Sequence, residues 1–219
     1  MDILPKNFEA TLKTKIIGHP LYIYQELDST QITAKFLAEK GAKEGAVVLA
    51  RSQKKGMGRN GKNWFSPEGG IWLTVILRPS FTLEQSNIIN VIFTTACMEV
   101  LRSFNVPNLA IKWPNDILIS GKKICGILTQ TKSGNKIEYV LVGVGINLNT
   151  EIEDFPAELK NTATSLRRET GKKIESDRFL AMLLEKIEEY YLMLKNKKNK
   201  TIQAKWGSFS LIGAQKSPS

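Results

Sequence analysis

Residues 110–149 read A-I-K-W-P-N-D-I-L-I-S-G-K-K-I-C-G-I-L-T-Q-T-K-S-G-N-K-I-E-Y-V-L-V-G-V-G-I-N-L-N, and this stretch decides the fold. Apolar runs at 110–113, 117–119, 123–130 and 137–149 are separated by turn residues such as Ser120-Gly121. Sequential strands joined by tight turns pair antiparallel, so the stretch predicts an antiparallel meander. Gly143 and Gly145 interrupt its last run, which indicates that another segment approaches this backbone closely.

Upstream of the meander, residues 21–27 (L-Y-I-Y-Q-E-L) predict a strand that leads into a helix. Asp28-Ser29-Thr30 is a cluster of N-cap residues, and Gly41 supplies the C-cap. The apolar residues that recur at helical spacing between them are Ile32, Phe36 and Leu37. The junction presents hydroxyl groups that can bind a polar ligand group, but it is equally a plain helix cap.

Buried strands and helices account for most of the remaining chain. Residues 47–51 predict a short strand, and residues 71–77 (I-W-L-T-V-I-L) a fully buried one. Thr82 and Gln85 form a capping box for a long buried helix with apolar residues Ile89, Ile92, Ala96, Val100 and Phe104. A short helix is expected at 163–170. Ser176 caps a final amphipathic helix whose core face is Leu180, Leu183, Leu184, Ile187, Tyr191 and Leu194.

Composition narrows the class of protein. The chain has 219 residues and a formal net charge of +10, and this charge calls for a nucleic-acid partner to be considered. The cations are dispersed, however, so we expect no specific nucleic acid. The 2 cysteines and the single histidine, His19, do not form a metal cluster or a catalytic triad. No apolar run approaches the about 20 residues of a membrane span, which predicts a cytoplasmic protein without a membrane partner.

A basic, glycine-rich segment follows the 47–51 strand. Residues 53–64 read Q-K-K-G-M-G-R-N-G-K-N-W and contain no acid. Its glycines let backbone N–H groups turn toward a ligand, and its cations suit an anionic one. The segment is therefore a mobile loop that closes on a phosphate-bearing molecule or, alternatively, a solvated basic hairpin. It matches neither a Walker loop nor a dinucleotide fingerprint.

The Ser29-Thr30 junction, the basic loop and residues 111–116 are candidates to converge on one site. Lys112 alternates with apolar neighbours in a predicted strand, so rigid backbone would place its ammonium group. Strand lysines usually lie at edges, but Pro114, Asn115 and Asp116 after it suggest the wall of a site. Cations without a protein nucleophile suggest activation of a carboxylate by ATP, because attack on the α-phosphate needs charge neutralisation and positioning.

Four motifs, in order, resemble the catalytic core of biotin protein ligases: G-M-G-R-N-G-K-N-W-F-S-P-E-G-G, K-W-P-N-D-I, G-K-K-I-C-G-I-L and G-V-G-I-N-L-N. The resemblance covers roughly residues 21–206. It implies an α+β fold, in which a mixed, mostly antiparallel sheet packs against helices. It also implies that biotin and ATP form biotinyl-5′-adenylate, and that biotin then passes to a lysine of a biotin carboxyl carrier protein domain. Mg²⁺ would arrive with ATP, without a dedicated protein metal site.

The resemblance also implies roles for individual residues. Lys112 and Arg59 would be catalytic, with Lys112 bridging the biotin carboxylate and the phosphate. The biotin head would contact the S-T-N-like triplet and the glutamine that opens the loop, and the loop would fold over biotin and the adenylate. The complete set of implied binding residues is Ser29, Thr30, Gln31, Gln53, Gly56, Met57, Gly58, Arg59, Trp64, Lys112, Asn115, Lys123, Gly126 and Asn147.

Three features depart from the family pattern. Gln31 stands where asparagine is usual, and Met57 replaces the first loop arginine, a cation for which Lys54 or Lys55 is the candidate substitute. The family continues into a small β-barrel domain, whereas here only a first strand at Leu211-Ile212 is expected. The predicted organisation is a ligase domain over residues 1–208 and a remnant of that barrel over 209–219.

Two other functions of the resembling superfamily stay open. A lipoate ligase or transferase has a related core, although the W-P-N-D motif and the loop favour biotin. A protein that binds biotinyl-adenylate but is impaired in transfer is the other, because of the short C-terminal end. The carrier and the oligomeric state, a homodimer included, stay undetermined by sequence.

Overall fold

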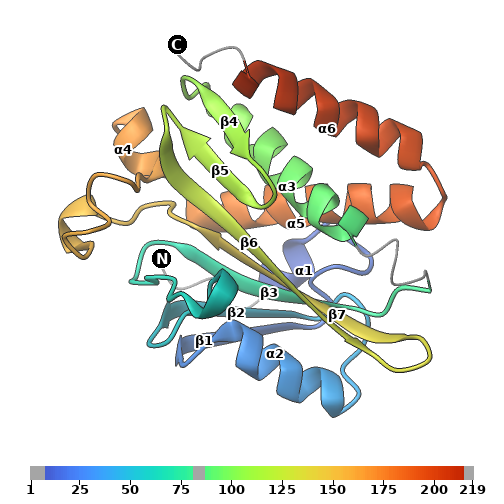
Figure 1. Ribbon diagram of the computed structural model, residues 1–219. Coiled ribbons are helices and arrows are strands. Elements are labelled where there is room, and N and C mark those ends of the chain that lie inside the picture. Colours follow the sequence, from blue (N-terminus) through green and yellow to red (C-terminus); the bar gives the residue numbers. More distant parts are fainter. Residues whose placement is uncertain (1–7, 81–86, 215–219) are drawn as a thin grey trace.

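The computed structural model describes residues 8–80 and 87–214, and a seven-stranded sheet organises them (Figure 1). The strand order is β1-β2-β3-β7-β6-β5-β4. Only β1 and β2 pair in parallel among these neighbours, so the predicted mixed, mostly antiparallel sheet is confirmed. The strand bounds are β1 Leu21–Leu27, β2 Val47–Gln53, β3 Ile71–Leu77, β4 Leu109–Lys112, β5 Asp116–Ile119, β6 Lys122–Ser133 and β7 Ile137–Ile146.

Helices cover the two faces of the sheet unequally. Helices α3 (Asn87–Arg102) and α5 (Ser176–Lys195) pack on one face, and α2 (Thr30–Glu39) packs on the other as the crossover between β1 and β2 (Figure 1). Helix α6 (Asn199–Ala214) lies beside β4 and α3. The shorter helices are α1 (Phe8–Thr11) and α4 (Leu166–Thr170), with single 3-10 turns at Arg59–Gly61 and Ile152–Asp154.

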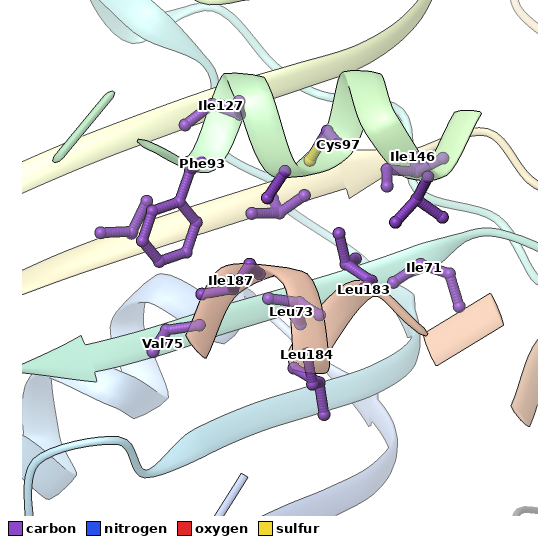
Figure 2. Close-up of a cluster of buried hydrophobic side chains, with 14 of the residues drawn as sticks. Ile71, Leu73, Val75, Phe93, Cys97, Ile127, Ile146, Leu183, Leu184 and Ile187 are labelled. Carbon is purple, nitrogen blue, oxygen red and sulfur yellow. The ribbon is translucent and has the colours of Figure 1, made fainter. Parts of the chain in front are cut away.

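The main core lies between the sheet and α3 and α5. All seven residues of β3 are buried, as its continuous apolar sequence predicted. Because strand side chains alternate, Ile71, Leu73 and Val75 meet α3 and α5, where Phe93 and Leu183 also lie (Figure 2). The alternate residues of β3, which include Thr74 and Ile76, face α2 and the cavity described below.

Helix α2 begins and ends near the predicted residues but buries a different stripe. Ser29 is the N-cap, and the Gln31 backbone N–H donates to its hydroxyl at 3.3 Å. The C-cap is Lys40, one residue before the predicted Gly41. Ile32 and Phe36 are 52% and 58% exposed, whereas Ala34 and Ala38 are buried. Small alanine side chains let α2 approach the sheet closely, and the larger residues therefore turn outward.

The predicted core face of α5 is confirmed, because all six of its residues are buried. The prediction that Ser176 caps this helix is wrong. Glu175 is the N-cap, and Ser176 is the first helical residue, where its Oγ accepts from Asn149 Nδ2 at 3.4 Å. Asn149 also accepts from the Ile174 backbone N–H at 2.8 Å, so this asparagine anchors the start of the helix. The short helix expected at 163–170 is α4, which Ser165 caps.

The predicted strand at Leu211-Ile212 is wrong, because this region belongs to α6. Ile202, Trp206 and Phe209 recur at helical spacing, and Ile202 and Phe209 are buried against the main core. Lys205 of the same helix pairs with Glu99 of α3 at 2.9 Å. The boundary at residue 208 is not tested by this finding and stays a prediction.

Two further expectations have limited outcomes. The Thr82–Gln85 capping box lies outside the described residues, although the buried helix that it would start is confirmed as α3. Within residues 8–80 and 87–214, none of the helices has the length and apolar character that crossing a membrane requires.

Candidate functional site

A cavity of about 410 Å³ opens between the N-terminus of α2, the basic loop and strands β6 and β7. It brings together most of the residues that the sequence predicted for a site. The predicted residues that line it are Ser29, Thr30, Gln31, Gln53, Met57, Gly58, Arg59, Trp64, Asn115, Lys123, Gly126 and Asn147. Gly56 and Lys112 are not among the lining residues.

Neutral hydrogen-bonding groups form the part of the cavity next to α2. The backbone N–H and the hydroxyl of Thr30 both donate to Gln53 Oε1, at 2.7 and 3.1 Å. The Thr74 hydroxyl donates to Thr30 Oγ1 at 2.9 Å, and Gln53 Nε2 donates to Ser66 Oγ at 2.8 Å. This chain of bonds joins β3, the start of α2, the end of β2 and the far side of the basic loop into one rigid unit.

The base of the basic loop is a narrow hairpin neck. Gln53 and Ser66 form an isolated antiparallel β-bridge. The Trp64 backbone N–H donates to the Gly56 carbonyl at 2.8 Å. A Cβ at Gly56 would lie 2.3 Å from the Trp64 carbonyl oxygen, so this position has room only for glycine. Gly56 therefore closes the loop on itself, and its predicted contact with a ligand stays a prediction.

The loop cations divide into two groups. Arg59 Nη1 donates to Asn115 Oδ1 at 2.7 Å, and Lys62 lines the same cavity. Lys54 instead pairs with Glu26 at 2.8 Å, and Lys55 pairs with Asp28 at 3.1 Å. The hydrogen bond and charge of Glu26 raise the pKa of Lys54. Neither paired lysine lines the cavity, whereas Lys62 does, and replacement of the cation missing at Met57 by Lys54 or Lys55 stays a prediction.

The indole ring of Trp64 packs directly on two glycines of the sheet, Gly126 and Gly145. A Cβ at Gly126 or Gly145 would come within 2.7 or 2.6 Å of its indole ring. Gly126 of β6 pairs directly with Gly145 of β7, so the two create one flat area. The predicted close approach at Gly145 is thus confirmed, and Trp64 is the residue that approaches.

Lys123 supplies the positive charge on the sheet side of the cavity. Its Nζ lies 2.9 Å from Asp116 Oδ1 and 4.8 Å from the centre of the Trp64 ring. Its backbone N–H donates to the Thr162 carbonyl at 2.7 Å, and its carbonyl accepts from the Thr164 N–H at 3.0 Å. The segment after β7 therefore holds Lys123 in position.

Lys112 is not among the residues that line the cavity, and its predicted role of bridging the reacting groups stays a prediction. Lys112 ends β4, an edge strand of the sheet, and its side chain is exposed outside the cavity. Its cross-strand partner is Asp116, which lines the cavity. Lys123, which the sequence assigned to the nucleotide side, occupies the cavity instead.

Sequence reasoning missed the segment that forms the outer wall. Phe155 and Leu159 line the cavity and pack with Phe65 and Ala163 in a small apolar cluster. The available signal was the pair of apolar residues four positions apart within an otherwise polar stretch.

The pairing register of β6 and β7 orders the site along one line. Gln31 lies against Gly143, which pairs with Leu128, and Trp64 lies over the Gly126–Gly145 pair two residues further along. Asn147 comes directly after the end of β7, and Lys123 precedes Gly126 on β6. At about 3.3 Å per residue, the strands therefore place a neutral amide end, an aromatic middle and a cationic end in sequence.

Three polar atoms that face this cavity are buried without a hydrogen-bond partner in the described structure: Gln31 Oε1, Trp64 Nε1 and Asn147 Oδ1. Buried polar groups are normally hydrogen-bonded, and exceptions call for a ligand, water or a functional role. The Asn147 amide nitrogen already donates to the Thr164 carbonyl at 3.0 Å, which leaves its oxygen as the available acceptor. The cavity thus offers both a donor and acceptors to a bound molecule.

Comparison with known proteins identifies the fold and the motifs together. A sequence profile of the biotin/lipoate A/B protein ligase family matches residues 23–147. The chain belongs to this family. It is 38% identical over 202 residues to the bifunctional ligase/repressor BirA of Bacillus spizizenii, covering 91% of this chain and 62% of that protein. The family motifs therefore lie around one cavity, but the chain spans less than two thirds of this relative.

Two other relatives extend the comparison. The biotin–[acetyl-CoA-carboxylase] ligase of Paracoccus denitrificans is 36% identical over 160 residues, or 71% of this chain and 66% of that protein. A biotin protein ligase from Aquifex aeolicus, solved in complex with biotin and ATP, superposes with a TM-score of 0.69 at 33% identity. That superposition covers 81% of this chain and 72% of the Aquifex chain. The family's α+β architecture is therefore present here.

Proposed function

We propose that this chain activates biotin with ATP to form biotinyl-5′-adenylate and then transfers biotin to a lysine of a carrier protein domain. The observation that carries the proposal is the order of the site along β6 and β7, from neutral amides through Trp64 to Lys123. A neutral hydrogen-bonding head and a carboxylate at opposite ends of one ligand fit this order. The family and the Aquifex complex with biotin and ATP support the same choice.

In the first half-reaction, a carboxylate oxygen of biotin attacks the α-phosphorus of ATP and pyrophosphate leaves. Thr30 and Gln53 position the head, while Arg59, Lys62 and Lys123 stabilise the negative charge that develops on the phosphate. Met57 and Gly58 form the loop backbone over the ligand, and the Asn147 amide and the Trp64 ring are available to the adenine. In this proposal Lys123, which lines the cavity, contributes a fixed charge, and the bridging role of Lys112 stays a prediction.

In the second half-reaction, the amine of a carrier lysine attacks the acyl carbon of the adenylate and AMP leaves. The carrier that we propose is a biotin carboxyl carrier protein domain. The exposed side of the loop, where Met57 is 39% exposed, lies beside the cavity from which the acyl carbon would be reached.

We propose that Mg²⁺ comes to the site bound to ATP. The described residues include no group of three or more His, Cys, Asp or Glu side chains that could hold a metal ion. Asp116 is the one carboxylate among the described lining residues, and Lys123 already neutralises it. The donor set therefore fits an ion held mainly by phosphate oxygens, as is usual for Mg²⁺ in nucleotide sites.

The proposal places the protein in the cytoplasm and includes no specific nucleic acid. Cys97 and Cys125 are buried free thiols, and burial raises the pKa of Cys125 well above its usual value, as suits an unreactive core residue. The apolar faces of helices α3 and α5 pack against the main core. A sedimentation measurement tests whether the protein forms a homodimer.

The test is a ligand-dependent ATP–pyrophosphate exchange assay with biotin, lipoate and octanoate in parallel. We expect exchange with biotin alone, followed by labelling of a carrier domain. Exchange with lipoate or octanoate but not with biotin would overturn the proposal in favour of the lipoate branch of the family. Exchange with biotin but no carrier labelling would limit the function to binding and activation.

A further inference from the structure

Asn90 links helix α3 to a connection that carries one of the cavity's polar side chains. Residues 113–115 join the end of β4 to the start of β5, and Asn115 among them lines the cavity. Asn90 Nδ2 donates to the Pro114 carbonyl at 2.6 Å. Neither Asn90 nor any other described residue of α3 is among those that line the cavity. The helix therefore reaches the site through a backbone atom of the 113–115 connection.

The bond that Asn90 makes differs from those of the other neutral polar groups nearby on α3. The helix packs on the main core with residues such as Phe93 (Figure 2). Thr94 and Thr95 are buried as well, but each hydroxyl donates to a carbonyl four residues earlier in the same helix, at 2.8 and 2.7 Å. Asn90 instead donates to a segment 24 residues away, where the carbonyl lies outside the sheet ladder. It thus satisfies a backbone acceptor that strand pairing does not.

Asn115 is held from the side of the sheet and faces the basic loop. Its Nδ2 donates to the Ile127 carbonyl at 2.8 Å, and the Ile127 N–H donates to the Asn115 carbonyl at 3.0 Å. Because only an amide nitrogen can donate to a carbonyl, the first bond fixes which side of the amide is oxygen. That oxygen, Oδ1, accepts from Arg59 Nη1 at 2.7 Å. A neutral oxygen holds the guanidinium group in place without cancelling its charge.

The two cations Lys123 and Arg59 depend on this connection to different degrees. Asp116, the partner of Lys123, is the first residue of β5 and is held by strand pairing on both sides. Asn115, the partner of Arg59, lies outside the strands and depends on individual hydrogen bonds. Asn90 fixes the carbonyl immediately before Asn115. Loss of that bond should therefore displace Arg59 more than Lys123.

We propose that Asn90 is a positioning residue for adenylation that acts on Arg59 through the 113–115 connection. This inference rests on the proposed function and adds a residue outside the cavity to it. Arg59 stabilises the developing charge only from the right position, because a displacement of about 1 Å can cost on the order of 10²-fold in rate. The loss should appear in kcat rather than in the KM for biotin, since the residues that position the head belong to α2 and β2.

The experiment measures ATP–pyrophosphate exchange by the intact chain and its Asn90→Leu and Asn90→Asp variants. Leucine keeps much of the side-chain volume but has no donor, whereas aspartate keeps the shape and presents an oxygen to the Pro114 carbonyl. Thr95→Val is the matched control, because it removes a buried polar group of α3 that bonds within the helix. Calorimetric titration with biotin gives the concentration of folded sites. Each rate is expressed per folded site, so that misfolded protein does not count as lost activity.

Asn90→Leu and Asn90→Asp should each lower kcat on the order of 10-fold per site, with the KM for biotin within about twofold of the unmodified chain. Thr95→Val should keep the kcat of the unmodified chain. A double-mutant cycle with Arg59→Ala supplies a readout that a purely structural role would not move. Arg59→Ala alone should slow exchange by on the order of 10²- to 10³-fold. In that background, Asn90→Leu should lower the rate by less than about threefold.

An equal loss from Asn90→Leu with and without Arg59 would overturn the inference, because Asn90 would then act only on structure. A normal kcat for both Asn90 variants, or the same loss from Thr95→Val, would overturn it as well. If Asn90→Leu does not fold, the same cycle with Asn90→Asp decides. Absence of biotin-dependent exchange by the unmodified chain would overturn the proposed function and this inference together. Normal exchange without coupling would overturn the inference alone.

Discussion

The two faces of the sheet use the same strands for different purposes. Toward α3 and α5, β7 presents Val142 and Val144, which are buried in the main core. Toward the cavity, the same strand presents Gly143 and Gly145, on which Gln31 and Trp64 lie. Valine and glycine alternate because side chains in a strand alternate between faces. One face is thus specialised for apolar burial, and the other provides space and backbone for a ligand site.

The strongest test of this contrast concerns charge at the cavity. Lys123→Gln should slow adenylation by on the order of 10²- to 10³-fold, because it removes a fixed positive charge from the developing phosphate charge. Lys112→Gln should change the rate less than about twofold, because Lys112 is exposed outside the cavity. Pyrophosphate exchange at saturating biotin and ATP measures both.

The same experiment needs a control for Asp116, which Lys123 neutralises. In the double variant Lys123→Gln/Asp116→Asn, both charges are removed together. If the double variant recovered the normal rate, Lys123 would serve only to balance Asp116, and its assigned role would be wrong. A large effect of Lys112→Gln would likewise restore the role that the sequence gave to that residue.

We expect effects of intermediate size from substitutions on the two opposite faces of β7. Gly145→Ala places a methyl group 2.6 Å from the Trp64 indole and should raise the KM for ATP by roughly 10-fold as Trp64 shifts. Val142→Ala should instead lower the free energy of unfolding by about 1–2 kcal/mol, since it removes buried methyl groups. Thermal melts and substrate kinetics on both variants separate the two effects. Identical behaviour of the two variants would contradict the division between faces.

The smallest effect compares cations of the basic loop. Lys62→Ala should slow adenylation by about 5- to 10-fold, because Lys62 lines the cavity on a solvent-accessible loop where screening weakens its charge. Lys54→Ala should be nearly neutral, because Lys54 pairs with Glu26 outside the cavity. Exchange rates at low and high salt check this, since only the Lys62 effect should shrink with added salt. If Lys54→Ala lowered the exchange rate more than Lys62→Ala, Lys54 would have to leave its ion pair with Glu26 to act at the cavity.

The sequence predicted the sheet well because its strands are long, apolar and separated by clear turns. Residues 71–77 could only be a buried strand, and the strands of 110–149 pair as the turns required. The N-cap at Ser29 and the close approach at Gly145 were also predictable, because cap residues and strand glycines have local physical causes. These features depend on neighbours in sequence.

The wrong predictions, and the positions that the sequence left open, depend on information that local sequence does not contain. Lys112 and Lys123 are both strand lysines, and only the strand order shows that the first lies on an edge. Ile32 and Phe36 have helical spacing, yet the close approach of α2 selects Ala34 and Ala38 for burial. At residues 211–212, the expectation of a strand came from the family pattern rather than from the helical spacing of Ile202, Trp206 and Phe209.

The contact between Trp64 and the Gly126–Gly145 pair lets side-chain volume be moved from the loop to the sheet. The indole ring fills the space above Gly126 and Gly145 that side chains would otherwise occupy. If a smaller residue replaces Trp64, a methyl group at position 126 or 145 can fill the freed space. Alternatively, the space can be left empty to accommodate an enlarged nucleotide. Because the loop and the sheet each contribute one side of this contact, a bump-and-hole pair can be engineered without altering Gln31, Lys123 or the core behind them.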